Sequence, residues 1–202
     1  MQATPRRARY GLLCLTTLTP KNMYSADLLT MGSTSLDVSG SSKIGMKKAL
    51  SLALHKGTDH ILLVQDDILA SADFIPTVQK IVDKYPDHLI SYFTPKKLSG
   101  STLIKSHHFC YAQAYSLPRK MAQEIVDFTS DQPTDDGHIN EYLVSTNQYH
   151  LLTNPSLVEH LGWDHTTLPH EKAKLQTYDK RRMAGNFIGL ENSGLEVDWI
   201  VI

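Results

Sequence analysis

The sequence predicts an α/β fold, with a mainly parallel sheet flanked by helices in a single domain. Predicted strands and helices alternate along the chain, which is typical of this class. The run 61–64 is apolar at four consecutive positions, as in a strand buried on both faces. The 202 residues and the 41% hydrophobic fraction are those of one globular domain with its own core.

The first 42 residues predict one strand and little else. Residues 10–17 form a short apolar run that ends before Pro20, and we expect a strand there. Residues 25–31 predict a short helix closed by Gly32, because glycine commonly follows the last residue of a helix. Residues 33–42 are rich in Ser, Thr and Gly and predict a loop or a brief strand.

The next helix and strand are the clearest pair in the chain. Residues 44–56 place Leu50 and Leu54 at helical spacing, and Gly57 is expected to cap the helix end. The apolar strand 61–64 follows directly.

The remaining elements are predicted from apolar runs and from residues that favour helix starts. The predicted helices are 72–84 capped by Ser71, 118–128 with Pro118 in its first position, and 137–146 capped by Asp136. The predicted strands are 88–94, 109–116 and 149–153, with a turn at 95–100. The Asn154–Pro155 pair is expected to end the last strand.

Charge and cysteine content exclude several function classes. The formal net charge of −1 argues against a generally basic nucleic-acid-binding protein. Cys14 and Cys110 have no metal-type spacing, so a disulfide framework and a zinc knuckle are excluded, and both are expected to be buried in a reduced compartment. The basic N-terminus lacks a signal-peptide cleavage pattern, and no apolar run reaches 18 residues, so we expect a cytoplasmic protein of a bacterium or a virus-infected host cell.

Two acidic pairs and one histidine are the candidates for chemistry. Asp66 and Asp67 follow the buried strand 61–64, at the strand end where α/β sheets bind ligands. Adjacent carboxylates there suit Mg²⁺ or Mn²⁺, although a solvated loop explains them equally well. Asp135 and Asp136 precede a predicted helix, where Asp136 suits either a general base or an ordinary N-cap. His160 is either a ligand or a structural residue.

Three segments in order resemble the core of GT-A (Rossmann-like) glycosyltransferases, a group that includes N-acetylglucosaminyltransferase-like and family 2-like enzymes. They are the helix from Lys43 with the following Gln65–Asp66–Asp67, the pair Asp135–Asp136, and the segment Asn154 to Gly162 that contains His160. The resemblance covers roughly residues 10–162 and implies a catalytic core over 1–162, with 163–202 closing over the donor. Gln65 stands where the family usually has an acid.

The resemblance implies a role for each candidate residue. Asp67 and His160 become metal ligands, and Asp136, the second member of its pair with Asp135, becomes the catalytic base of an inverting enzyme. The residues it implies for binding the nucleotide-sugar are Thr16, Thr17, Asp37, Lys43, Gln65 and Asp66.

The sequence therefore predicts a metal-dependent glycosyltransferase that uses Mn²⁺ or Mg²⁺ and a nucleotide-sugar, with a UDP-sugar favoured. The acceptor is a saccharide, a protein or modified DNA. One alternative is a non-catalytic sugar- or nucleic-acid-binding domain on the same scaffold, which Gln65 favours. Another is a sugar nucleotidyltransferase, disfavoured because no glycine-rich loop follows the first strand.

Overall fold

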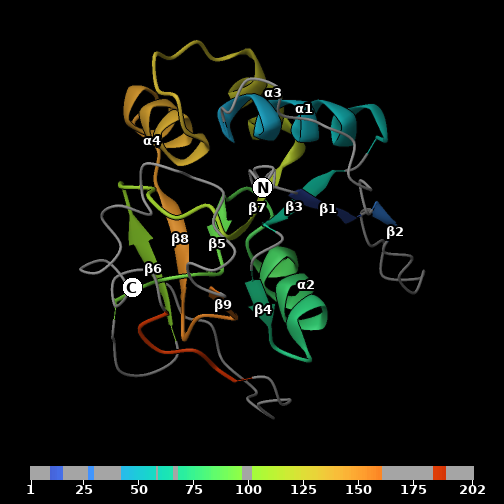
Figure 1. Ribbon diagram of the computed structural model, residues 1–202, viewed down its shortest axis with the longest axis vertical. Coiled ribbons are helices and arrows are strands. Elements are labelled where there is room, and N and C mark those ends of the chain that lie inside the picture. Colours follow the sequence, from blue (N-terminus) through green and yellow to red (C-terminus); the bar gives the residue numbers. More distant parts are fainter. Residues whose placement is uncertain are drawn as a thin grey trace, which may run out of the picture.

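The structure is a computed structural model that describes residues 10–15, 27–29, 42–57, 59–65, 68–96, 102–160 and 184–189. Two layers of helices enclose a central sheet (Figure 1). The helices are α1 (Ser42–His55), α2 (Phe74–Lys84), α3 (Arg119–Asp127) and α4 (Asp135–Ser145). None of the described helices is long and apolar enough to cross a membrane.

The described strands form a seven-stranded sheet in the order β2-β1-β3-β7-β5-β8-β6 and a separate two-stranded sheet of β4 and β9. Their bounds are β1 (Tyr10–Leu15), β2 (Asp27–Leu29), β3 (His60–Gln65), β4 (Ile68–Ala70), β5 (Ile90–Ser91), β6 (Thr102–Ser106), β7 (Ala114–Pro118), β8 (His150–Asn154) and β9 (Val158–His160).

The sheet is mixed, so the prediction of a mainly parallel sheet is wrong. Among the described strands of this sheet, only β5 and β8 pair in parallel, and every other pair of neighbours is antiparallel. The three strands that follow helices, β3, β5 and β8, all run in one direction. β7 inserts between β3 and β5 in the opposite direction, and this insertion separates strands that would otherwise form a parallel core. Alternation of helices and strands predicts the class but not the place where a returning strand inserts.

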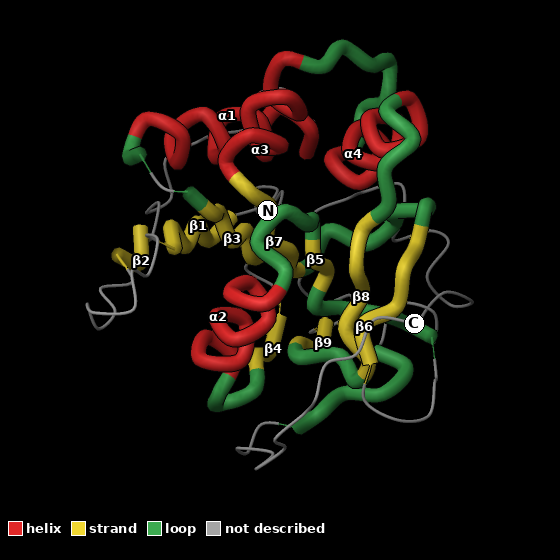
Figure 2. The backbone as a smooth tube through the Cα atoms, turned by 180° about the vertical axis from the view of Figure 1, so that it is seen from behind, coloured by secondary structure: helices red, strands yellow, loops and turns green. Residues whose placement is uncertain are grey.

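Each face of the sheet carries its own hydrophobic core. Helices α1, α3 and α4 pack on one face, with Ile61 and Leu63 of β3 in their cluster. Helix α2 packs on the other face, with Leu62 in its cluster. Figures 1 and 2, viewed from opposite sides, show α2 separated from the other helices by the sheet. The side chains of Ile61, Leu62 and Leu63 are at most 2% exposed, which confirms a strand buried on both faces.

The helix predicted at 25–31 is absent, because residues Asp27–Leu29 form β2 instead. Leu29 pairs with Leu12, and Asp27 pairs with Cys14 of β1. An isolated helix of seven residues has little stability of its own. The hydrogen bonds offered by the edge of β1 therefore decide the conformation of this segment.

The other predicted strands exist, but two of them are shorter than predicted. β8 matches the prediction within one residue, whereas the strand predicted at 88–94 is confined to Ile90–Ser91. The strand predicted at 109–116 begins only at Ala114. The sequence did not predict β4, β6 and β9, since their short segments lack a clear apolar alternation.

Three predicted helix starts also shift. The N-cap of α2 is Asp73 rather than Ser71. Pro118 is the last residue of β7 and the N-cap of α3 rather than its first residue, so α3 begins at Arg119, one residue later than predicted. The N-cap of α4 is Thr134, whose hydroxyl accepts a hydrogen bond from the Gly137 amide, so Asp136 is not the cap.

Candidate functional site

The acidic pair lies in the first turn of α4, and its two members have different surroundings. Asp135 is 5% exposed, whereas Asp136 is half-buried. The Asp135 Oδ1 atom accepts the Asp136 amide at 2.9 Å, and Asp136 Oδ1 accepts the Gly137 amide at 2.8 Å. Both carboxylates therefore use amide groups at the helix start, where negative charge is favoured. The half-buried Asp136 is the member that a substrate can reach.

Ser42 joins the starts of α1 and α4 through Asp135. The Ser42 hydroxyl donates to Asp135 Oδ1 at 3.0 Å and accepts the Asp135 amide at 3.0 Å. Burial, together with the nearby charge of Asp136, raises the pKa of Asp135 to about 6, although the bonds from Ser42 and the Asp136 amide oppose the rise. Asp135 is thus a buried acid that holds two helices together, and this favours a positioning role over direct catalysis.

The Lys43 side chain is hydrogen-bonded to the backbone of the loop that precedes α4. Its Nζ atom donates to the carbonyl of Ser130 at 3.0 Å, and Lys47 donates to the carbonyl of Phe128 at 2.7 Å. These bonds attach α1 to the 128–130 segment. The structure therefore gives Lys43 a structural partner in this conformation, whereas the sequence-based interpretation assigns it to the donor.

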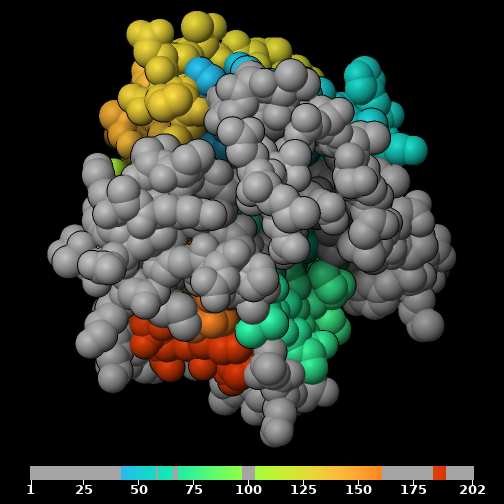
Figure 3. Space-filling model, in the orientation of Figure 1, coloured from blue at the N-terminus to red at the C-terminus, as the bar shows by residue number. Residues whose placement is uncertain are grey.

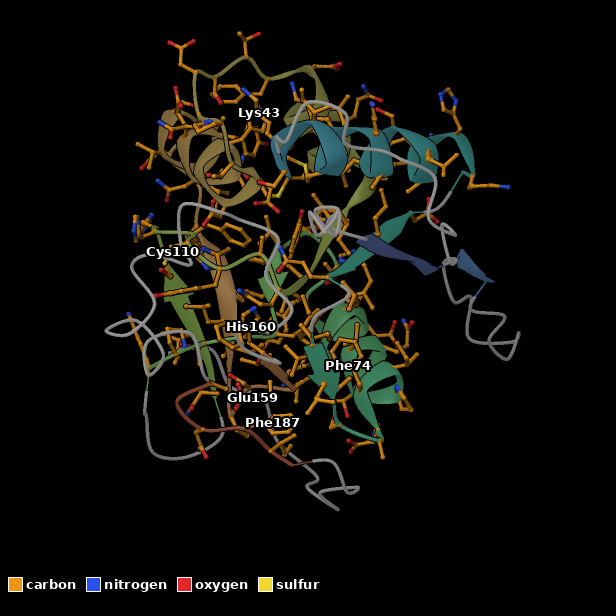
Figure 4. All side chains as sticks on the ribbon, in the orientation of Figure 1. Lys43, Phe74, Cys110, Glu159, His160 and Phe187 are labelled. Carbon is orange, nitrogen blue, oxygen red and sulfur yellow. The ribbon has the colours of Figure 1, made fainter. Side chains whose placement is uncertain are left out.

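Gln65 and His160 are the described candidates for the proposed donor and metal sites. Gln65 is half-buried at the end of β3, where its backbone amide donates to the backbone carbonyl of Gln113 at 2.8 Å. His160 is 3% exposed in β9, and the antiparallel register places it opposite Ile68, the residue after Asp67 in the sequence. Figure 4 shows His160 near the middle of the molecule, between α2 and β8.

Five predicted site residues lie outside the described residues: Thr16, Thr17, Asp37, Asp66 and Asp67. Among the residues that the structure does describe, there is no group of three or more His, Cys, Asp or Glu side chains able to hold a metal ion. A metal at this end of β3 would therefore depend on Asp66 or Asp67. Of the described candidates, Lys43, Asp135 and Asp136 lie in the first turns of α1 and α4, whereas Gln65 ends β3 and His160 ends β9.

Residues 184–189 return from the C-terminal part of the chain to the ends of β5 and β8. The Gly185 amide donates to the Thr94 carbonyl at 2.9 Å, and the Ser156 amide donates to the Asn186 carbonyl at 2.8 Å. Glu159 of β9 accepts the Ala184 amide at 2.7 Å through its carboxylate. In Figure 3 this segment (red) forms part of the surface on the face shown. The chain after the predicted core therefore contacts the residues that flank His160.

Ser42 is the functional candidate that the sequence-based reasoning missed. The sequence carried one signal for it, since serine is common immediately before a helix. Its actual partner is Asp135, 93 positions away, and such a pairing is visible only in three dimensions.

The comparisons with known proteins give no family. The chain matches no protein-family model, and a search of curated proteins found no significant relative.

Proposed function

We propose that this protein is a metal-dependent glycosyltransferase, which moves a sugar from a nucleotide-sugar to an acceptor hydroxyl with inversion. The observation that carries the proposal is the pairing of β4 with β9. This register sets His160 opposite the residue that follows Asp67. The resemblance to GT-A enzymes assigns these two residues to one metal shell, although they are distant in sequence. The pairing of Ile68, the next residue in the chain, with His160 supports that assignment.

The donor set suits the proposed metal. A carboxylate oxygen and an imidazole nitrogen are ligands that Mn²⁺ accepts, and carboxylates also suit Mg²⁺. Asp67 and His160 would hold the ion, and Gln65 and Asp66 would contact the nucleotide-sugar. The bound metal would stabilise negative charge on the departing diphosphate. A UDP-sugar is the favoured donor.

Asp136 is the proposed base. As the acceptor oxygen attacks the anomeric carbon, the bond from that carbon to the diphosphate breaks, and the hydroxyl proton passes to the Asp136 carboxylate. The Gly137 amide orients this carboxylate through Oδ1. Asp135 fixes the first turn of α4 through Ser42 and does not contact the substrate in this proposal.

Donor binding is the first experiment, because it tests the proposal before the acceptor is known. Thermal unfolding is measured with UDP-, GDP-, TDP- and CMP-sugars, each with and without Mn²⁺. A ligand at about 100 times its dissociation constant adds roughly 2.7 kcal/mol to the free energy of unfolding. We expect such a gain with one nucleotide only, dependent on Mn²⁺ and absent in Asp67→Asn.

The matched control is Asp131→Asn, which changes an exposed carboxylate in the loop before α4. It should keep the full metal-dependent gain. Asp136→Asn should also keep donor binding, and should lose turnover once an acceptor is found. Stabilisation by a nucleotide-sugar without any metal dependence would favour the non-catalytic binding domain, and stabilisation by none of them would refute the proposal.

A further inference from the structure

A small cavity lies along the segment between β6 and β7, which is hydrogen-bonded to α4. Its volume is about 70 Å³, and its walls are mostly apolar, with Phe109, Tyr111 and Leu152 among them. Cys110 also lines it, on the segment between β6 and β7 (Figure 4). The exposed Lys96 belongs to the lining as well, so the cavity reaches the surface. A space of this size takes a few heavy atoms of a ligand rather than a whole sugar ring.

His150 supplies an unused polar atom in this wall. The side chain is 1% exposed, and its Nδ1 atom has no hydrogen-bond partner among the residues that the structure describes. Burial lowers the pKa of His150 to about 4, while a hydrogen bond with the backbone of Ser106 acts in the opposite direction. The imidazole is therefore neutral at pH 7. A neutral imidazole has one ring nitrogen that donates and one that accepts, so Nδ1 can accept a hydrogen bond from a ligand hydroxyl when the proton is on the other nitrogen.

A hydrogen bond joins the wall of the cavity to α4. The Phe109 amide donates to Asn140 Oδ1 of α4 at 2.9 Å, which fixes the cavity wall to the helix that carries the proposed base. Burial raises the pKa of the Cys110 thiol, and the negative charge of Asp136 adds to this rise.

We propose that this cavity binds a hydroxymethyl group of the acceptor, so that the acceptor is a hexose-type saccharide with a free primary hydroxyl. The hydroxyl donates to Nδ1 of His150, and the methylene carbon lies against Phe109 and Leu152. This inference rests on the proposed function and adds the substrate class that the sequence leaves open. The volume suits the group, and the hydroxyl pairs a buried acceptor that is otherwise unsatisfied.

Selectivity is the expected consequence. A sugar without the primary hydroxyl leaves the buried nitrogen unpaired, and a site built to bond a hydroxyl discriminates strongly against such an analogue. We expect methyl glucoside to bind at least roughly tenfold more tightly than methyl xyloside or the 6-deoxy analogue.

Cys110 provides a readout that needs neither turnover nor a donor. The chain has two cysteines, so Cys14→Ser leaves Cys110 as the only thiol. The rate of its alkylation by iodoacetamide is measured at increasing concentrations of each sugar. Methyl glucoside should protect Cys110, and each of the other two sugars should need about ten times the concentration.

His150→Phe tests the assigned atom, because it keeps a ring against Phe109, whose centroid is 5.1 Å away, and removes the acceptor. In this variant all three sugars should protect Cys110 at similar concentrations. His107→Phe, at an exposed position two residues from Lys105, is the matched control and should keep the discrimination. The wild-type comparison of sugars does not depend on either variant folding.

Equal protection by all three sugars, or protection by none, would overturn the inference. If a nucleotide-sugar stabilises the protein with Mn²⁺ in that case, the proposed function stands without it. If no nucleotide-sugar stabilises the protein while methyl glucoside protects Cys110 selectively, the proposed function fails and the cavity is still a saccharide site.

Discussion

The raised pKa of Asp135 predicts how the free energy of unfolding changes with pH, and this prediction depends only on described residues. Asp135→Asn keeps the shape of the side chain, and the amide oxygen still accepts from Ser42 and from the Asp136 amide. The change removes the charge of a carboxylate that is 5% exposed. The comparison therefore isolates the cost of ionising this group inside the protein.

The magnitude follows from the pKa. Burial raises the pKa of Asp135 from the ordinary 3.8 to about 6. A carboxyl with a raised pKa binds its proton more tightly when folded, so the contribution of Asp135 to the free energy of unfolding is lost as pH rises from about 4 to about 6. At 1.36 kcal/mol per pKa unit the full loss is about 3 kcal/mol. About 2 kcal/mol of this falls between about pH 4.5 and about pH 8.

The assay is urea unfolding of wild type and Asp135→Asn at several values of pH. The difference between the two free energies of unfolding cancels the titration of every other group that does not interact with Asp135. We expect the variant to gain about 2 kcal/mol relative to wild type between about pH 4.5 and about pH 8. The exposed Asp131→Asn should show no such trend. A difference that is constant with pH would refute the raised pKa of Asp135.

Three further predictions concern the scaffold. Ser42→Ala removes both hydrogen bonds to Asp135 and should cost about 1.5–3 kcal/mol in urea unfolding, because the acceptor is a buried carboxyl group, whereas Ser145→Ala in the last turn of α4 should cost less than half as much. Burial lowers the pKa of His60 to about 4, so the neutral form is favoured on folding, and the contribution of His60 to the free energy of unfolding should fall as pH drops from about 6.5 to about 4. The difference in free energy of unfolding between wild type and His60→Gln should therefore fall over the same range, and a difference that stays constant with pH would contradict the assignment. Gly57 has a φ of +74° after α1, so Gly57→Ala should lower the free energy of unfolding by about 1 kcal/mol although no atom lies within 4 Å of the added methyl; a neutral result would argue against the left-handed conformation.

The strongest local patterns in the sequence predicted the structure well. Residues 61–64 lie in β3 with neighbouring side chains in opposite cores, and the helix predicted at 44–56 is α1, which begins two residues earlier. Both predictions depend on apolar periodicity over a long or fully buried segment. The strand predicted at 149–153 also survives as β8, because the Asn154–Pro155 pair marks its end.

The same local reasoning misplaced the acidic cap of α4. Aspartate is a good N-cap, so Asp136 was a reasonable choice, but Thr134 takes that position and moves the helix start back to Asp135. Only the contact with Ser42 explains why Asp135 turns inward. A local preference does not distinguish two neighbouring aspartates.

The sequence by itself determined the class of fold, the central strand and the residue types available for chemistry, because periodicity and composition act over a few neighbouring positions. The tertiary structure alone decided the mixed sheet, the strand at 27–29, the register that sets His160 opposite Ile68, and the contact between Ser42 and Asp135. Each of these depends on hydrogen bonds between segments far apart in the chain. Their free energy is gained only when the whole sheet assembles, so no short window of sequence contains it.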